Sequence, residues 1–150
     1  MPQYNLTLDD FVRESWRLSN QPELWLAKVE ELIEAHKTLL SLPHPLTTKD
    51  LEVFVKVAEP DAKLRRDDKY AVGELNVLLR TAGYLMKHGR SADGAVEYHQ
   101  RFMHLMPFTS CNARVARALW LWMLETEEPT RSFCEDYYIR SMRGIKSWPE

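Results

Sequence analysis

Apolar residues recur at helical spacing along most of the chain. The clearest stripe follows a turn at residues 19–22 and repeats every 3.6 residues. Its members are Leu26, Val29, Leu32, Ile33, His36, Leu39 and Leu40. No run of β-branched and aromatic residues alternates with polar ones between turn residues, as a strand would require. The pattern therefore predicts an all-α fold.

Capping residues predict where two N-terminal helices begin. Thr7 is followed by Asp10 at the spacing of a capping pair. In such a pair the hydroxyl accepts from a free backbone N–H, and the acid is favoured by the positive end of the helix dipole. We expect this helix to end at about residue 18. Thr47 should open a second, short helix that runs to about residue 58.

Proline and glycine predict the breaks between the next helices. Pro43 and Pro45 cannot donate to the helical ladder, so they end the helix that carries the apolar stripe. Residues 59–68 are strongly charged and contain a further proline, which predicts a connecting loop or a frayed turn. A long helix over residues 69–87 should then close at Gly89, because glycine readily adopts the left-handed conformation of a helix end.

Small residues and a proline recur at equal intervals in the stretch from Gly83 to Pro107. Gly83 and Ala95 would let two helices approach closely, and Pro107 would end the second helix. In these positions residues 76–109 resemble the tetratricopeptide repeat, a unit of about 34 residues that folds as a helix, a turn and a second helix. Further positions that look like the repeat pattern are Asp93, Val96, Glu97, Tyr98, Gln100, Arg101 and Leu105.

The resemblance is divergent and covers about half of the chain. The first unit departs from the pattern at Leu79, Ala82, Met86, Gly89 and Phe102. A looser second unit would occupy residues 110–146, with its first helix capped by Thr109 or Ser110. Its two helices are expected over residues 112–125 and 130–146. Pro129 breaks the period where the repeat places a small residue, so a longer turn is expected there.

The helix pattern and the length of 150 residues predict a single helical domain, residues 1–150, of about seven helices. The resemblance implies that they are arranged as stacked antiparallel hairpins. Residues 69–148 would supply the repeat-like hairpins. The helices of residues 1–60 would form a cap or a separate binding element.

In such repeats the first helix of each unit lines a concave groove, which here implies a short basic groove. The residues carried over to it are Arg80, Tyr84, Lys87 and His88, with Arg114 one period beyond Arg80. A guanidinium offers a fixed fork of donors that suits a carboxylate. The expected function is a non-catalytic adaptor, chaperone-like or assembly subunit that binds another protein, as an acidic peptide or a partner helix. The alternative is that the two arginines are solvated or pair with neighbouring acids such as Glu74.

Charge is unevenly distributed within the net charge of −2. Residues 61–121 carry 10 Lys and Arg against 6 Asp and Glu, a net +4 between two acidic flanks. An alternative function is therefore a small helical subunit of a nucleoprotein complex, since phosphate contacts need clustered cations. Its contacts would be Lys63, Arg65, Arg66 and Lys69. An isoelectric point near 6.2 argues against this function, and the cations could instead pair within the fold.

Tryptophans gather toward the C-terminal end of the chain. The most apolar segment, residues 113–124, predicts a central buried helix, since it is too short to span a bilayer core of about 30 Å. Trp120 and Trp122 point about 200° apart on that helix, so both are buried only if it is covered on two sides. We expect these two, with Trp148, to belong to a core or to an interface of a homo-oligomer or larger complex.

Residues that could carry chemistry form no catalytic or metal-binding pattern. His99 and His104 lie about 140° apart on a helix and cannot share a metal, and His36 falls on an apolar stripe. Cys111 and Cys134 show no CxxC spacing and are expected to be buried, reduced thiols. We therefore expect no enzyme activity, cofactor or metal. The N-terminal residues lack the pattern of a signal or transit peptide, so a cytoplasmic location is expected, with no membrane contact.

Overall fold

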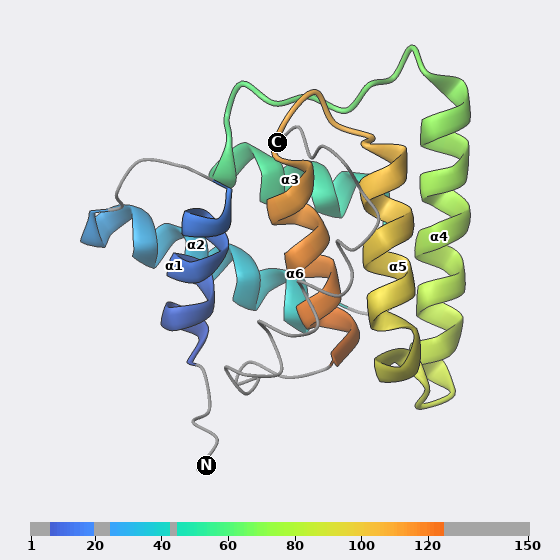
Figure 1. Ribbon diagram of the computed structural model, residues 1–150, viewed down its shortest axis with the longest axis horizontal. Helices are drawn as coiled ribbons and strands as arrows, with labels where there is room; N and C mark the ends of the chain where they lie inside the picture. The colour runs from blue at the N-terminus through green and yellow to red at the C-terminus, as the bar shows by residue number, and fades with distance from the viewer. Residues whose placement is uncertain (1–6, 20–24, 43–44, 125–150) are drawn as a thin grey trace.

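Six α-helices follow one another in the computed structural model, which describes residues 7–19, 25–42 and 45–124 (Figure 1). They are α1 (Leu8–Leu18), α2 (Leu26–Ser41), α3 (Thr48–Ala58), α4 (Lys69–Lys87), α5 (Ser91–Leu105) and α6 (Asn112–Leu124). Within these residues there is no strand, and the only extended pairing is an isolated bridge between Leu64 and Phe108. The all-α prediction is confirmed. The seventh helix, expected over residues 130–146, lies outside the described residues.

Helix α6 forms the centre of the fold. Twelve of its thirteen residues are buried, and helices α1, α2, α3 and α5 all contact it. Figure 1 shows α6 between the pair α1 and α2 on one side and the pair α4 and α5 on the other. The central buried helix that the apolar segment predicted is thus confirmed. A helix surrounded by others can be apolar on every side, which explains why its sequence shows no clear polar face.

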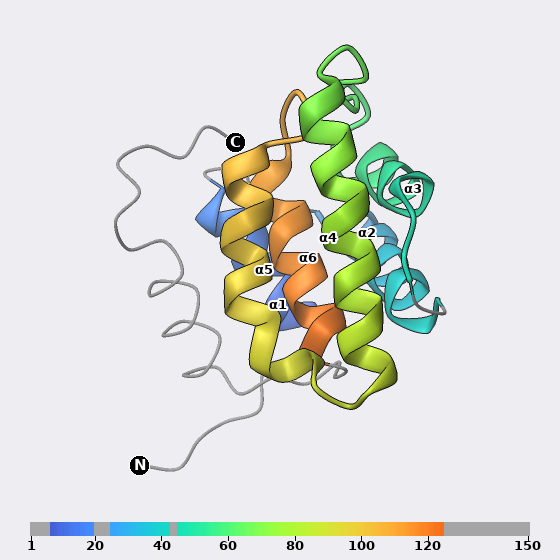
Figure 2. The same cartoon turned by 90° about the vertical axis from the view of Figure 1, so that its right-hand side faces the viewer.

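Helices α4, α5 and α6 run as antiparallel neighbours in chain order. Figure 2 shows the chain running down α4, up α5 and down α6, and α5 contacts both of the others. The bounds of α4 match the predicted helix over residues 69–87. Gly89 follows it with a φ of +68°, which is the left-handed conformation expected of a helix-closing glycine.

The predicted capping residues fix the N-termini of two helices. Thr7 accepts a hydrogen bond from the Asp10 N–H at 3.1 Å, and the Asp10 carboxylate accepts one from the Thr7 N–H at 3.2 Å. Thr47 and Asp50 form the same reciprocal pair at the start of α3. Each pair satisfies backbone donors that have no intrahelical partner. These local predictions are confirmed.

The connection before α4 is joined to the connection before α6. The Thr109 N–H donates to the Lys63 carbonyl at 2.8 Å, and its hydroxyl accepts from the Lys63 N–H at 2.9 Å. The prediction that Thr109 or Ser110 caps α6 is wrong, because α6 begins at Asn112. Its first backbone hydrogen bond is accepted by the carbonyl of Cys111 from the Val115 N–H, so Cys111 occupies the capping position. Thr109 instead holds two connections side by side.

Gly83 makes room for a proline, contrary to the expectation that it brings two helices together. A Cβ on Gly83 would lie 2.7 Å from the Cβ and 2.8 Å from the Cα of Pro45, in the connection between α2 and α3. On α5, a Cβ added to Gly94 would lie 3.0 Å from the side chain of Leu85 on α4. The close approach predicted at Gly83 is therefore present, but its neighbour is different.

Two glycines of α4 form a matched pair for testing this contact. Gly83→Ala is expected to lower the free energy of unfolding by about 1–3 kcal/mol, because the new methyl group meets the backbone of Pro45. Gly73→Ala should raise it by roughly 0.5–1 kcal/mol, since nothing lies within 4 Å and alanine favours a helix. Urea unfolding of both variants measures the difference. Shifts of the same sign would contradict the packing described for Gly83.

Candidate functional site

The exposed face of α4 carries three large side chains at intervals of seven residues. Tyr70 is 73% exposed, Val77 40% and Tyr84 63%. A helix turns 3.6 residues per turn, so positions seven apart drift by only about 20° and form one stripe. The opposite face of α4 is buried, at Ala71, Leu75, Leu78, Leu79, Ala82 and Gly83. The stripe thus lies on the side of α4 that faces solvent.

Cations flank this stripe along one side. Arg80 and Lys87 each follow a stripe residue by three positions, which places them about 60° from it on the same side of the helix. Both are exposed, and neither has an ion-pair partner in the part of the chain that the structure describes. At the end of the helix, the Tyr84 and His88 rings stack with centroids 4.2 Å apart. Three of the five predicted groove residues are therefore exposed on α4, and His88 is exposed at its C-cap. We call this surface, Tyr70, Val77, Arg80, Tyr84, Lys87 and His88, the α4 face.

A hollow of about 340 Å³ adjoins the α4 face near the start of α4. Its walls are Tyr70, Glu74, Val77 and Leu78 from α4 and Arg101, His104 and Leu105 from α5. Arg101 pairs with Glu97 at 3.0 Å and lies over the Tyr98 ring. The hollow is therefore continuous with the apolar stripe and has a polar rim on the α5 side.

Arg114 does not join the other predicted groove residues. Its side chain is 3% exposed and donates to the Ala58 carbonyl at 3.1 Å and to the Glu59 carboxylate at 3.0 Å. Its guanidinium also lies 4.7 Å from the centre of the Trp16 ring. The prediction that Arg114 and Arg80 line one groove is wrong, because α6 is covered on every side. Arg114 instead ties α6 to the end of α3.

A second buried arginine lies among polar groups that the sequence did not indicate. Arg117 is 2% exposed. Its Nε donates to the Ser15 hydroxyl at 2.8 Å, and one terminal nitrogen donates to the Ser15 carbonyl at 2.6 Å. The same nitrogen donates to the Ser19 hydroxyl. These bonds join α6 to the last turn of α1. They make Arg117 a structural residue.

Two buried histidines share this interior. The pKa of His36 is lowered from 6.5 to about 4, chiefly by burial. A hydrogen bond that His36 Nδ1 donates to the Leu32 carbonyl partly opposes this shift, and the nearby charge of Arg117 adds to it. Burial, and to a smaller extent the positive charge of Arg117, lowers the pKa of His99 to about 3. His36 packs edge-on against the rings of Phe11 and Phe54. Both histidines are therefore neutral core residues at neutral pH.

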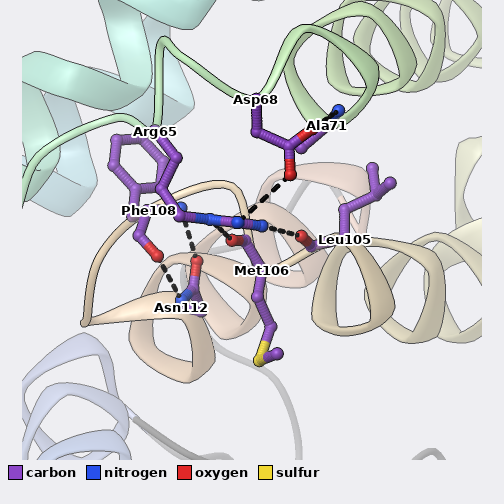
Figure 3. Close-up of polar contacts among 7 residues, drawn as sticks. All are labelled: Arg65, Asp68, Ala71, Leu105, Met106, Phe108 and Asn112. Carbon is purple, nitrogen blue, oxygen red and sulfur yellow. Dashed lines mark hydrogen bonds and ion pairs between the residues drawn. The ribbon is translucent and has the colours of Figure 1, made fainter.

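Arg65, a predicted nucleic-acid contact, closes the C-terminal end of α5. Its Nε donates to the Met106 carbonyl at 2.7 Å and its Nη2 to the Leu105 carbonyl at 2.8 Å (Figure 3). The guanidinium also pairs with Asp68 at 3.1 Å, and Asp68 in turn accepts from the Ala71 N–H at the start of α4. Met106 has a left-handed φ of 42°, which exposes the last carbonyls of the helix to this arginine.

The other cations of the basic segment are only partly available to a partner. Arg66 donates to both carboxylate oxygens of Glu52 at 2.7 and 2.6 Å. Lys63 and Lys69 are exposed. The four predicted phosphate contacts therefore do not form one free cluster, because Arg65 and Arg66 are already bonded within the fold. Of the ten Lys and Arg residues in residues 61–121, four form ion pairs within the described fold, and Arg117 is buried with hydrogen bonds to Ser15 and Ser19.

The predicted interface tryptophans are core residues where the structure describes them. Trp120 is 3% exposed and Trp122 is 1% exposed, on opposite sides of the central helix. Both tryptophans are buried because other helices cover α6 on both sides, as expected. Trp148 lies outside the described residues, as does Cys134. Cys111 is a buried free thiol, as predicted.

A larger groove, which the sequence did not indicate, runs between α2 and α3. Its volume is about 930 Å³. The apolar part of its lining consists of Ala27, Ala35, Leu39, Leu42, Val53, Phe54, Val57 and Pro60. Acids line its α2 edge at Glu30, Glu31 and Glu34. The only sequence signal for this groove is Val53, an apolar residue on the polar side of a short helix, which is 57% exposed.

Among the described residues, no group of three or more His, Cys, Asp and Glu side chains is placed to hold a metal ion. None of the described helices is both long and apolar enough to cross a membrane. Comparison with known proteins finds no matching family model, no similar curated protein and no similar solved structure. The surfaces of the molecule itself are therefore the basis for a function.

Proposed function

We propose that the chain is a non-catalytic protein-interaction module whose α4 face binds an amphipathic helix with acidic residues beside its apolar stripe. The observation that carries this proposal is the exposed stripe of Tyr70, Val77 and Tyr84 at intervals of seven residues. Side chains at this spacing contact a second helix along its whole length, as in paired helices. Exposed tyrosines also supply large contact areas at interfaces.

The charges beside the stripe favour an acidic partner. Arg80 and Lys87 lie on one side of the stripe, and neither forms an ion pair within the described fold. A guanidinium binds a carboxylate through two parallel hydrogen bonds, and an ammonium adds a mobile charge. The adjoining hollow between α4 and α5 can take one apolar side chain of the partner.

The resemblance to tetratricopeptide repeats supports the same class of function. The first helix of such a repeat lines a binding groove, and α4 would be that helix here. The assignment of Arg80, Tyr84, Lys87 and His88 to a binding face does not depend on Arg114, which is buried in the centre of the fold. The proposed surface is therefore one helix face with an adjoining hollow.

Copurification tests the α4 face. The tagged chain, isolated from its own cells, should recover a protein partner that Arg80→Glu with Lys87→Glu reduces by about tenfold or more, since two like charges would face the partner's acids. Lys63→Glu is the matched control, because Lys63 is also an exposed cation of the positive middle segment and lies outside the α4 face. Equal recovery with the double variant and the wild type would exclude the α4 face as the binding site.

A further inference from the structure

The groove between α2 and α3 has the chemistry to accept a basic amphipathic helix. Its floor is apolar, and Val53 is 57% exposed within it although it lies beside the buried core residue Phe54. Its α2 edge carries Glu30, Glu31 and Glu34, all exposed. An apolar strip with acids along one edge is the kind of surface that can accept the apolar face of a basic amphipathic helix.

Few of the groove's cations offset this acidic edge. Lys28 is committed to the fold, since its Nζ donates to the Val57 carbonyl at 2.6 Å and lies 3.5 Å from Glu31. Glu34 has only a contact of 4.0 Å with Lys37. Lys56 and Asp50 line the opposite, α3 edge; Lys56 is exposed, and Asp50 is half-buried and paired with Thr47 at the start of α3. The groove therefore has an acidic edge on α2 and an edge of mixed charge on α3.

We propose that this groove receives the α4 face of a second copy of the chain, so that copies associate head to tail. This inference rests on the proposed function of the α4 face and names its partner. The α4 face is itself a basic amphipathic helix surface, with an apolar stripe in the middle. The groove is the acidic, apolar surface that this face requires, and it is present on the same molecule.

The cations on one side of α4 match the acidic α2 edge of the groove. Arg80 and Lys87 lie on one side of the stripe, where they would face the glutamates of α2. Glu74 lies about 60° from Val77 on the other side, where it would face Lys56 on α3. Opposite charges thus meet along the acidic α2 edge, while the α3 edge presents both Lys56 and Asp50. Docking in the reverse direction across the groove would place Glu74 beside the glutamates of α2, which disfavours it.

The α4 stripe agrees in length with the α2 side of the groove. From Tyr70 to Tyr84 the stripe spans about 21 Å at 1.5 Å per residue. The part of α2 that lines the groove, residues 27–41, spans about 21 Å on the same basis. The α3 side, residues 50–58, spans about 12 Å, so α2 would supply the longer of the two edges for a docked helix.

The contact would be heterologous, because the two surfaces share no residue. Each bound pair of copies still has one free α4 face and one free groove. Such a contact generates an open chain of copies or, when the rotation between neighbours closes, a ring. The expected species in solution is thus a series that grows with concentration and shrinks with salt, which screens the charged edges.

Light scattering and sedimentation of the purified full chain test this proposal. The average mass should rise with protein concentration at low salt and fall as salt is added. Two variants separate the surfaces: Arg80→Ser with Tyr84→Ser removes the α4 face, and Glu34→Ser with Val53→Ser removes the groove. Each variant alone should remain monomeric, because only one of its two surfaces is intact. All four positions are exposed, so retention of the helical circular-dichroism signal is expected.

Mixing the two variants gives the decisive result. An equimolar mixture should form a dimer and stop there, since the groove of one variant binds the α4 face of the other and both remaining surfaces are damaged. Lys63→Ser is the control and should associate like the wild type. A wild-type chain that stays monomeric at every concentration would overturn self-association. The copurification experiment would then still test whether the α4 face binds a different protein. Association that survives the groove variant would overturn the groove as the docking site.

Discussion

Acidification from neutral pH to about pH 5 is expected to lower the free energy of unfolding by roughly 4 kcal/mol, about 2 kcal/mol for each of two buried histidines. His36 and His99 have pKa values of about 4 and about 3 in the fold, against 6.5 for a solvated histidine. Between pH 6.5 and those lower pKa values, both histidines are protonated in the unfolded chain but stay neutral in the folded chain. Stability is therefore complete above pH 6.5 and falls as the pH drops through that window.

Urea unfolding between pH 7.5 and pH 5 measures this effect before most carboxylates take up protons. His36→Leu should remove about half of the acid sensitivity, because leucine fits the apolar site between Phe11 and Phe54 and does not titrate. His104→Gln is the control, since it replaces a histidine that is exposed on the same helix as His99. A wild-type chain equally stable at both ends of this pH range would contradict the burial of the two histidines.

Interactions between residues close in sequence account for the predictions that the structure confirms. Thr7 with Asp10 and Thr47 with Asp50 act within one helical turn, so the sequence alone specifies them. The left-handed Gly89 is equally local. The apolar pattern of residues 113–124 also sufficed to predict a buried helix, because a segment without a polar face has no favourable place at the surface.

Interactions across long stretches of chain account for the site residues that were assigned wrongly. The partners of Arg114 are 55 and 56 residues away, and Arg117 bonds to groups about 100 residues away. An arginine within an apolar helix can be solvated, lie in a groove or be buried against carbonyls, and only the packing of α1 and α3 on α6 decides between these. Arg65 is a similar case, since its partners on α5 are 40 and 41 residues distant.

Part of the α4 face could be predicted from the sequence, whereas the groove between α2 and α3 could not. Arg80, Tyr84 and Lys87 lie on one helix, so their common face follows from helical geometry alone. The α2–α3 groove needs two helices at a particular separation, and the acids of α2 read in the sequence as an ordinary solvated side. Sequence periodicity shows which side of a helix is polar, but it does not show which polar sides adjoin an apolar hollow.

Trp122→Ala is expected to lower the free energy of unfolding by about 3–5 kcal/mol, the usual cost of removing a large aromatic side chain from a core. Trp122 is 1% exposed and is among the largest fully buried side chains. A loss of this size is a large part of the total stability of an ordinary domain, roughly 5–15 kcal/mol. Trp122→Phe, which keeps most of the apolar volume, should cost less and remains measurable if the alanine variant does not fold.

Trp25→Ala is the matched control for this substitution, because it makes the same change at a tryptophan that is 73% exposed. Its effect on unfolding should stay within about 0.5 kcal/mol. Urea unfolding and light scattering of both variants distinguish a core tryptophan from an interface tryptophan, since a core residue changes stability at every protein concentration. If Trp122→Ala left the unfolding midpoint unchanged and abolished association instead, the tryptophan would belong to an interface, and the central position of α6 would have to be abandoned.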